Sequence, residues 1–335
     1  FFTGGALVLY AARAGAMEAK GLFGMFSRES ALVANNILLA VAAFVVFIGT
    51  IWPLVAEIMS GRSISVGEPF FNAAFTPFFV ALAVILPPGA MLAWKRGDLR
   101  RALRSLAPVA VLAVALGGLA FALQTGRSAL GPIGAMLGAW VVLGALWDLW
   151  ARTGRGGGRL GRLMRLPRAD WGKAAAHSGL GITVFAVAAM NAWAVEDIRV
   201  AQLGETFPLG RYDVTLREVH QVPGPNYTSP TAEMVVTRAG AQVAVLYPEK
   251  RVYPVQAMPT TEAAIDYGFL RDLYLVIGDP QEGGGWAVRG YVKPFANWLW
   301  GGALLMALGG GLSLSDRRYR VAAGARKAPA GGPAE

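Results

Sequence analysis

Long apolar stretches constrain the fold of this chain more than any other feature of its sequence. Each is about 20 residues long and nearly free of charge, which is the length that an α-helix needs to cross a bilayer. Only 16% of the 335 residues are charged, against about a quarter in soluble domains. The pattern predicts a mainly α, polytopic membrane helix bundle embedded in a lipid bilayer. We expect about seven spans, near residues 1–12, 31–55, 71–94, 106–123, 131–150, 173–195 and 292–314.

The start of the chain and its basic links predict how the spans are oriented. The apolar run 1–12 is too short to span a bilayer, and it lacks the basic n-region of a signal peptide. We therefore expect a truncated first span and a missing N-terminal part. Alternate short links carry three, one, five, one and seven Lys or Arg residues, and such residues collect in cytoplasmic links. This alternation predicts a basic cytoplasmic tail at 315–335 and places 196–291 on the opposite side of the membrane.

Residues 196–291 differ in kind from the rest of the chain. Apolar and polar side chains alternate at period two, for example over 211–216 and 273–276. Turn-forming pairs such as Pro223-Gly224 separate these runs. We predict a small antiparallel β domain, inserted between the last two spans and lying outside the membrane.

The charge distribution argues against nucleic acid as a partner. The chain carries a net charge of +10, but residues 196–289 hold 12 acidic and 8 basic residues, a net charge of −4. The other residues therefore carry +14, and this excess lies in the links and the tail that flank the spans. Basic residues in those places are typical of membrane topology rather than of a nucleic-acid surface.

His177 is the candidate site residue. It is an ionisable ring about one turn inside the span 173–195, where such a group is costly and by default functional. Imidazole is an axial ligand of haem iron, so the candidate cofactor is haem b. The small residues Ala174, Ala176 and Gly181 predict a shallow trough for a flat macrocycle. The alternative is a packing histidine bonded to a neighbouring helix, because small residues also line ordinary transmembrane interfaces.

The remaining polar residues have simpler interpretations. His220, the only other histidine, lies in the predicted β domain and is interpreted as a surface residue of a strand or loop. A second axial ligand would then come from the missing N-terminal portion, a methionine, a second subunit or water. Asp148 lies at the membrane interface, where it can snorkel or pair with a loop arginine. We expect Asn35 or Asn36 to bond another helix.

No catalytic residue can be assigned. Paired carboxylates, a Ser/His/Asp set and zinc-type spacing are all missing from the sequence. Because the chain contains no cysteine, disulfides, thiolate metal sites and covalent haem attachment are excluded within it.

Several segments, taken in order, are similar to one protein family. They are Ser27-Arg28-Glu29-Ser30, Gly49-Thr50-Ile51-Trp52-Pro53, Val66-Gly67-Glu68-Pro69-Phe70-Phe71-Asn72, Pro248-Glu249-Lys250-Arg251, Asp272-Leu273-Tyr274 and Trp286-Ala287-Val288-Arg289. With them the chain resembles the C-terminal portion of the CcmF family, the haem lyase subunit of cytochrome c-type biogenesis.

The resemblance implies a role for this chain in the bacterial inner membrane. His177 matches the family's second transmembrane histidine, which ligates a b-type haem, and 196–291 becomes a periplasmic domain. The implied partners are other cytochrome c maturation subunits, a haem chaperone and apocytochrome c, to which the complete complex attaches haem through thioether bonds. The family's Trp-rich motif and periplasmic histidines have no counterpart here.

Two other classes of function compete with this interpretation. A transporter or permease is one, because Pro87-Pro88 should kink the span 71–94 and broken helices line substrate sites. A membrane-anchored scaffold is the other, with 196–291 binding partners while the spans only hold it in place.

Overall fold

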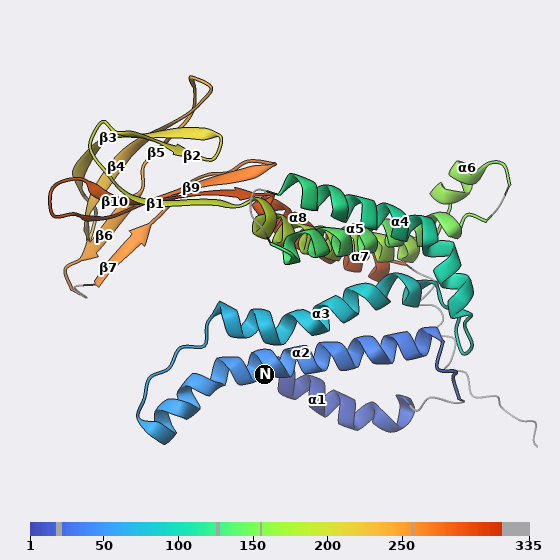
Figure 1. Cartoon of the computed structure of the whole chain (residues 1–335). Coiled ribbons are helices and arrows are strands. Elements are labelled where there is room, and N and C mark those ends of the chain that lie inside the picture. Colours follow the sequence, from blue (N-terminus) through green and yellow to red (C-terminus); the bar gives the residue numbers. More distant parts are fainter. Residues whose placement is uncertain (18–21, 125–127, 155, 256–257, 317–335) are drawn as a thin grey trace, which may run out of the picture. The chain divides into compact units, whose positions relative to one another are not determined.

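The computed structural model describes residues 1–17, 22–124, 128–154, 156–255 and 258–316 (Figure 1). They divide into two compact units, Phe1–Ser105 and the chain from Leu106 onward. Most of the basic tail predicted at 315–335 lies outside the described residues.

The first unit is helical. It contains α1 (Phe2–Arg13), the 3-10 turn η1 (Ala14–Met17), α2 (Arg28–Ser60), α3 (Glu68–Met91) and the first residues of α4 (Leu99–Leu123). α2 and α3 pack antiparallel through glycine: a Cβ on Gly49 would lie 2.6 Å from the ring of Phe70, and one on Gly89 would lie 2.9 Å from the Cβ of Ala31.

α3 also bears on the transporter alternative. It continues as a helix through Pro87-Pro88 and ends only at Met91. The broken helix that this alternative would require is therefore not found within the described range of α3. Within the described part of the chain, the expected bond from Asn35 or Asn36 to another helix is also not found, and the Asn35 amide instead donates to the Asn36 side chain at 3.2 Å.

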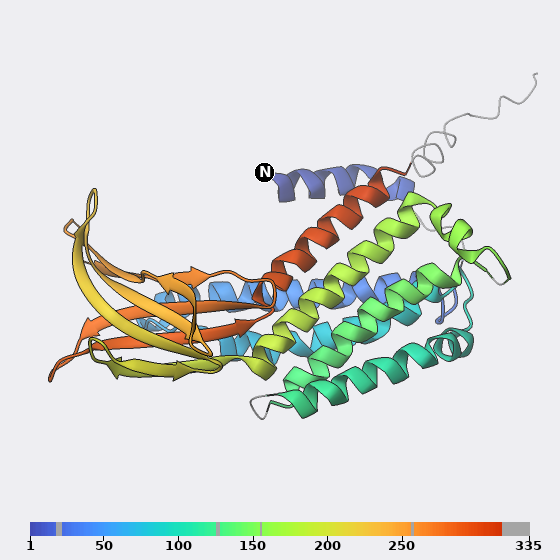
Figure 2. The same cartoon turned by 90° about the horizontal axis from the view of Figure 1, so that it is seen from above.

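The second unit contains a helix bundle built around one central helix. Its helices are the remainder of α4, then α5 (Leu130–Ala151), α6 (Arg159–Met164), α7 (Arg168–Trp193) and α8 (Ala296–Leu314). α7 lies between α5 and α8, and α8 runs antiparallel to it (Figure 2).

Small residues bring these helices into near-backbone contact. A Cβ on Gly309 of α8 would lie 2.5 Å from the backbone nitrogen of Ala176. On the other side of α7, a Cβ on Gly138 of α5 would lie 2.7 Å from the backbone oxygen of Gly181. Lipid offers no hydrophobic driving force between helices, so close packing of small residues is the expected source of cohesion.

Five helices are long and apolar enough to cross a membrane by length and composition, namely α2, α3 from Pro69 onward, α4, α5 and α7. The predicted spans 1–12 and 292–314 also form helices, α1 with 12 residues and α8 with 19, but neither is among these five. The prediction for the last span was wrong at its start, because 292–294 complete a strand and the helix begins at Ala296.

The predicted antiparallel β domain is confirmed as a sandwich of two sheets. Its strands are β1 (Val195–Ala201), β2 (Thr206–Leu209), β3 (Tyr212–Pro223), β4 (Thr228–Arg238), β5 (Ala241–Leu246), β6 (Glu249–Tyr253), β7 (Met258–Glu262), β8 (Ala264–Asp266), β9 (Arg271–Pro280) and β10 (Trp286–Pro294). One sheet has the order β1-β10-β9-β8 and the other β2-β3-β4-β6-β7, with β5 also paired to β4. Alternating side chains from both sheets fill the core, among them Phe207, Leu216, Met234, Leu273, Leu275 and Ile277.

The sandwich joins the helix bundle through two very short connections. Only Ala194 separates α7 from β1, and only Phe295 separates β10 from α8. β1 and β10 pair with each other, starting with Val195 opposite Val292. Phe295 has a φ of 55°, a left-handed conformation that turns the chain sharply into α8. Both ends of the sandwich are therefore tied to the same pair of adjacent helices.

Candidate functional site

His177 lies on α7, half-buried, on a side of the helix that its two neighbours leave partly open. The side toward α8 carries Gly179 and the side toward α5 carries Gly181. Leu180 and Val184, one and two turns beyond His177, are only half-buried on the remaining side. His177 therefore stands at the margin of the α5 contact rather than inside a helix interface.

The expected trough at Gly181 was not found. A Cβ on Gly181 would lie 2.7 Å from both the backbone oxygen of Gly138 and the side chain of Val142, so α5 already fills this space. Ala176 also lies in a helix contact, because its backbone packs against Gly309 of α8. These small residues serve helix packing, and any flat ligand of His177 would have to lie along the open side of α7.

The imidazole of His177 has no hydrogen-bond or ion-pair partner among the described residues. A packing histidine bonded to a neighbouring helix, which was the alternative interpretation, would show such a bond. An ionisable ring without one, on a helix of membrane-spanning length, keeps a nitrogen available for a ligand.

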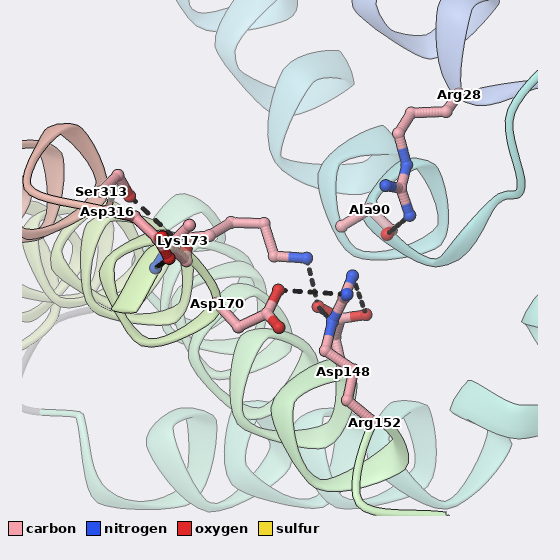
Figure 3. A network of polar contacts seen from close by, with 9 residues as sticks. Arg28, Ala90, Asp148, Arg152, Asp170, Lys173, Ser313 and Asp316 are labelled. Atoms are coloured by element: carbon pink, nitrogen blue, oxygen red, sulfur yellow. Dashed lines mark hydrogen bonds and ion pairs between the residues drawn. The ribbon is translucent and has the colours of Figure 1, made fainter. Parts of the chain in front are cut away.

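Within two turns of His177, a cluster of four charged residues joins α5 to α7 (Figure 3). Asp148 is 5% exposed and accepts from Lys173 at 2.5 Å and from Arg152 at 3.2 Å. Arg152 also pairs with Asp170 at 3.1 Å. The expected pairing of Asp148 with an arginine is confirmed. Two carboxylates and two cations compensate one another, which makes their burial tolerable.

The start of α7 is held by the end of α8. The Asp316 carboxylate accepts from the backbone nitrogen of Ala169 at 3.1 Å, and the Ser313 hydroxyl donates to the backbone oxygen of Ala169 at 3.4 Å (Figure 3). A carboxylate at the first turn satisfies a free amide and suits the helix dipole. α7, which carries His177, is thus anchored on the end where the charge cluster lies.

His220 lies on β3, as its interpretation as a surface residue predicted. Its side chain is 57% exposed, and its Nε2 lies 2.8 Å from a carboxylate oxygen of Glu218. Among the described residues no group of three or more His, Asp or Glu side chains could hold a metal ion.

The segments behind the family resemblance have structural roles. In the first unit, Ser27 caps α2, the Arg28 guanidinium donates to the backbone oxygen of Ala90 at 3.0 Å, and Glu29 accepts from the backbone nitrogen of Lys95 at 2.8 Å. Figure 3 also draws the Arg28 bond. In the sandwich, Lys250 pairs with Asp279. These residues hold loops and a helix end in place.

Sequence reasoning allowed for the Asp148–arginine pair but missed that Lys173 and Asp170 join it in a cluster beside His177. Its signal was visible, since Lys173 precedes His177 by one helical turn and Asp148 is an acid at the end of an apolar run. What the sequence could not supply was that α5 and α7 are neighbours.

The two structural parts define the class of protein: a multi-pass membrane helix bundle with a β-sandwich inserted before its last helix. Residues 192–294 match the model of the CcmF C-terminal β-sandwich. Over 98% of its length the chain is 63% identical to the cytochrome c-type biogenesis protein ccl1 of Rhodobacter capsulatus. It belongs to the CcmF family of cytochrome c-type biogenesis proteins.

Other relatives agree with this assignment. The chain is 39% identical, over 95% of its length, to the cytochrome c-type biogenesis protein CcmF of Escherichia coli. A solved structure named cytochrome c heme lyase CcmF shares the fold, with a TM-score of 0.66 at 24% identity over 87% of this chain and 46% of the other. The chain spans about half the length of the curated relatives it matches, 50% of ccl1 and 48% of the Escherichia coli protein.

Proposed function

We propose that this chain seats a b-type haem through His177 in a haem lyase of cytochrome c maturation. In this proposal the lyase attaches haem to apocytochrome c at the periplasmic face of the bacterial inner membrane, where the sandwich lies. The haem chaperone, the apocytochrome and other maturation subunits are its partners. The names of the relatives support the pathway, and the residues around His177 support the cofactor.

The residues present fit a haem with one axial ligand from this chain. An unpartnered imidazole can donate a nitrogen lone pair to haem iron. The open side of α7 continues from His177 with Leu180 and Val184, whose aliphatic side chains suit the face of a macrocycle. A b-type haem bound here would supply a one-electron redox centre. Its second axial ligand is expected from the N-terminal portion found in longer family members.

Residues of this chain would hold that centre in place. The ion pairs of Asp148 with Lys173 and of Arg152 with Asp170 tie α5 to α7 within two turns of His177. Asp316 fixes the first turn of α7. With the helix pinned on two sides, the imidazole keeps one position relative to the bundle. The observation that carries the proposal is the unpartnered His177 ring on the open side of a membrane helix.

Haem content of the purified protein tests the assignment. In protein extracted from its host membranes, His177→Ala is expected to lose most of the haem absorbance, whereas His220→Ala, which removes the chain's other histidine, keeps it. His177→Gly with added imidazole should recover the absorbance, because free imidazole can occupy the vacated ligand position. Normal haem content in folded His177→Ala protein would contradict the proposal. Covalent haem staining of the host's c-type cytochromes then reports whether the loss of bound haem also lowers the attachment of haem to apocytochrome c.

A further inference from the structure

The loop between β8 and β9 exposes three large apolar side chains within four residues. Tyr267 is 69% exposed, Phe269 is 75% exposed and Leu270 is 59% exposed. Together these residues, 267–270, form the β8–β9 loop. A cluster of this kind at the surface is typical of an interaction site rather than of a solvated loop.

The exposure is not a result of poor anchoring, because three consecutive carbonyls of the loop accept hydrogen bonds from the start of α8. The donors and distances are the Asn297 amide to Gly268 at 3.0 Å, the Trp298 indole to Phe269 at 2.9 Å and the backbone nitrogen of Phe295 to Leu270 at 2.9 Å. Asp272 adds a fourth tie, since its carboxylate accepts from the backbone nitrogen of Gly268 and from Asn297. The backbone is held while the apolar side chains point away from it.

The base of the loop is fixed to the sandwich as well. The Arg271 guanidinium donates to the Asp266 carboxylate at 2.5 Å and to the Tyr212 hydroxyl at 2.9 Å. Although burial opposes it, these hydrogen bonds raise the pKa of Arg271, which stays charged at any relevant pH. The β8–β9 loop is therefore a rigid bridge between the sandwich and α8.

Helix geometry shows which side of α8 the loop covers. Asn297, Leu304 and Leu308 are spaced seven and four residues apart, so they lie along one side of the helix. Leu304 is 65% exposed and Leu308 is 70% exposed, whereas Gly302 and Gly309 face α7. The loop thus lies over the side of α8 that is turned away from the bundle, which in a membrane is the side toward lipid.

Aromatic contacts fix the depth of the loop. The ring centroid of Trp298 lies 5.4 Å from that of Phe269 and 5.8 Å from that of Phe185 in α7. The last residue of α7 is also a tryptophan, Trp193. Tryptophans at the end of a span are typical of the headgroup level of a bilayer. The loop is therefore at the level of the membrane interface on the sandwich side.

We propose that the β8–β9 loop is an interfacial anchor that inserts Tyr267, Phe269 and Leu270 into the phospholipid leaflet on the sandwich side. Its partner is the bilayer itself, because the loop continues the lipid-facing side of α8 at the depth where amphipathic aromatic side chains prefer to lie. Burial of these side chains in lipid fixes the height and tilt of the sandwich over the membrane. This role is independent of haem binding at His177.

Site-specific labelling tests the anchor. Because these 335 residues contain no cysteine, an introduced cysteine is the one thiol in them that the label can modify. Leu270→Cys is labelled with an environment-sensitive fluorophore in protein reconstituted into phosphatidylcholine nanodiscs that contain lipids with nitroxide-bearing acyl chains. Leu203→Cys is the matched control, because Leu203 is also 59% exposed but follows the end of β1 farthest from α7. Phe269→Cys repeats the measurement if the first variant does not fold.

The expected result is that the label at 270 loses most of its fluorescence to lipid nitroxides and resists aqueous iodide, while the label at 203 behaves in the opposite way. Equal lipid quenching at the two positions would overturn the proposal. So would a label at 270 that is shielded from both quenchers, since that pattern means that protein rather than lipid covers the loop.

Discussion

The β-sandwich and the α5–α7–α8 bundle belong to one compact unit but are stabilised by different side chains. In the sandwich core, large aliphatic residues such as Leu275 and Met234 are completely buried. In the bundle, glycine and alanine make the helix contacts, as at Gly309 and Gly138, while leucines such as Leu304 are exposed. The sandwich excludes water from an apolar core, whereas the bundle relies on close contact and compensated charge in an apolar solvent.

The largest expected effect comes from the same substitution made in both regions. Leu275→Ala should destabilise the sandwich by about 2–5 kcal/mol, because it removes a buried side chain and leaves a cavity. Leu304→Ala should cost far less, since this side chain is 65% exposed on the side of α8 away from α7 and its truncation leaves no cavity. Hydrogen exchange of peptides from β9 and thermal unfolding in detergent measure the two effects. Equal losses would break the distinction between the regions.

A charge substitution compares the regions at a smaller scale. Asp148→Asn should destabilise the bundle by about 1.5–3 kcal/mol, because a buried carboxylate that serves two cations becomes neutral. In the sandwich, Asp279→Asn should change stability by about 0–1 kcal/mol, because Asp279 is 70% exposed in its pair with Lys250. Melting temperatures of the detergent-solubilised variants give the comparison. A larger loss for Asp279→Asn would show that the bundle does not depend on its charge cluster.

The smallest expected effect sharpens the account of helix packing. Gly309→Ala should cost about 1–3 kcal/mol, because the new Cβ would meet α7 backbone at 2.5 Å and the helices must separate. Gly310→Ala, one position along, meets nothing within 4 Å and should be neutral or slightly stabilising, since alanine favours helix. Thermal unfolding of both variants tests this. Matching melting temperatures would mean that α7 and α8 are not in backbone contact.

Much of the secondary structure could be predicted because it depends on local periodicity. The apolar runs at 131–150 and 173–195 correspond to α5 and α7, and the alternating run at 273–276 lies within β9. The prediction was wrong where two patterns meet without a turn. Residues 292–294 directly precede an apolar run, and only the pairing of β10 with β1 and β9 shows that they belong to a strand.

The candidate site shows the same limit more sharply. By itself the sequence determined that His177 is an ionisable ring inside an apolar helix and that no cysteine or second membrane histidine accompanies it in this chain. Only the tertiary structure decided that α5 fills the space beside Gly181, that Asp148 reaches Lys173, and that the β8–β9 loop lies over the side of α8 turned away from α7. The physical reason is that periodicity reports which side of an element is apolar, whereas in a membrane nearly every side is apolar. Which helix packs against which then depends on shape and on polar contacts between residues far apart in the chain.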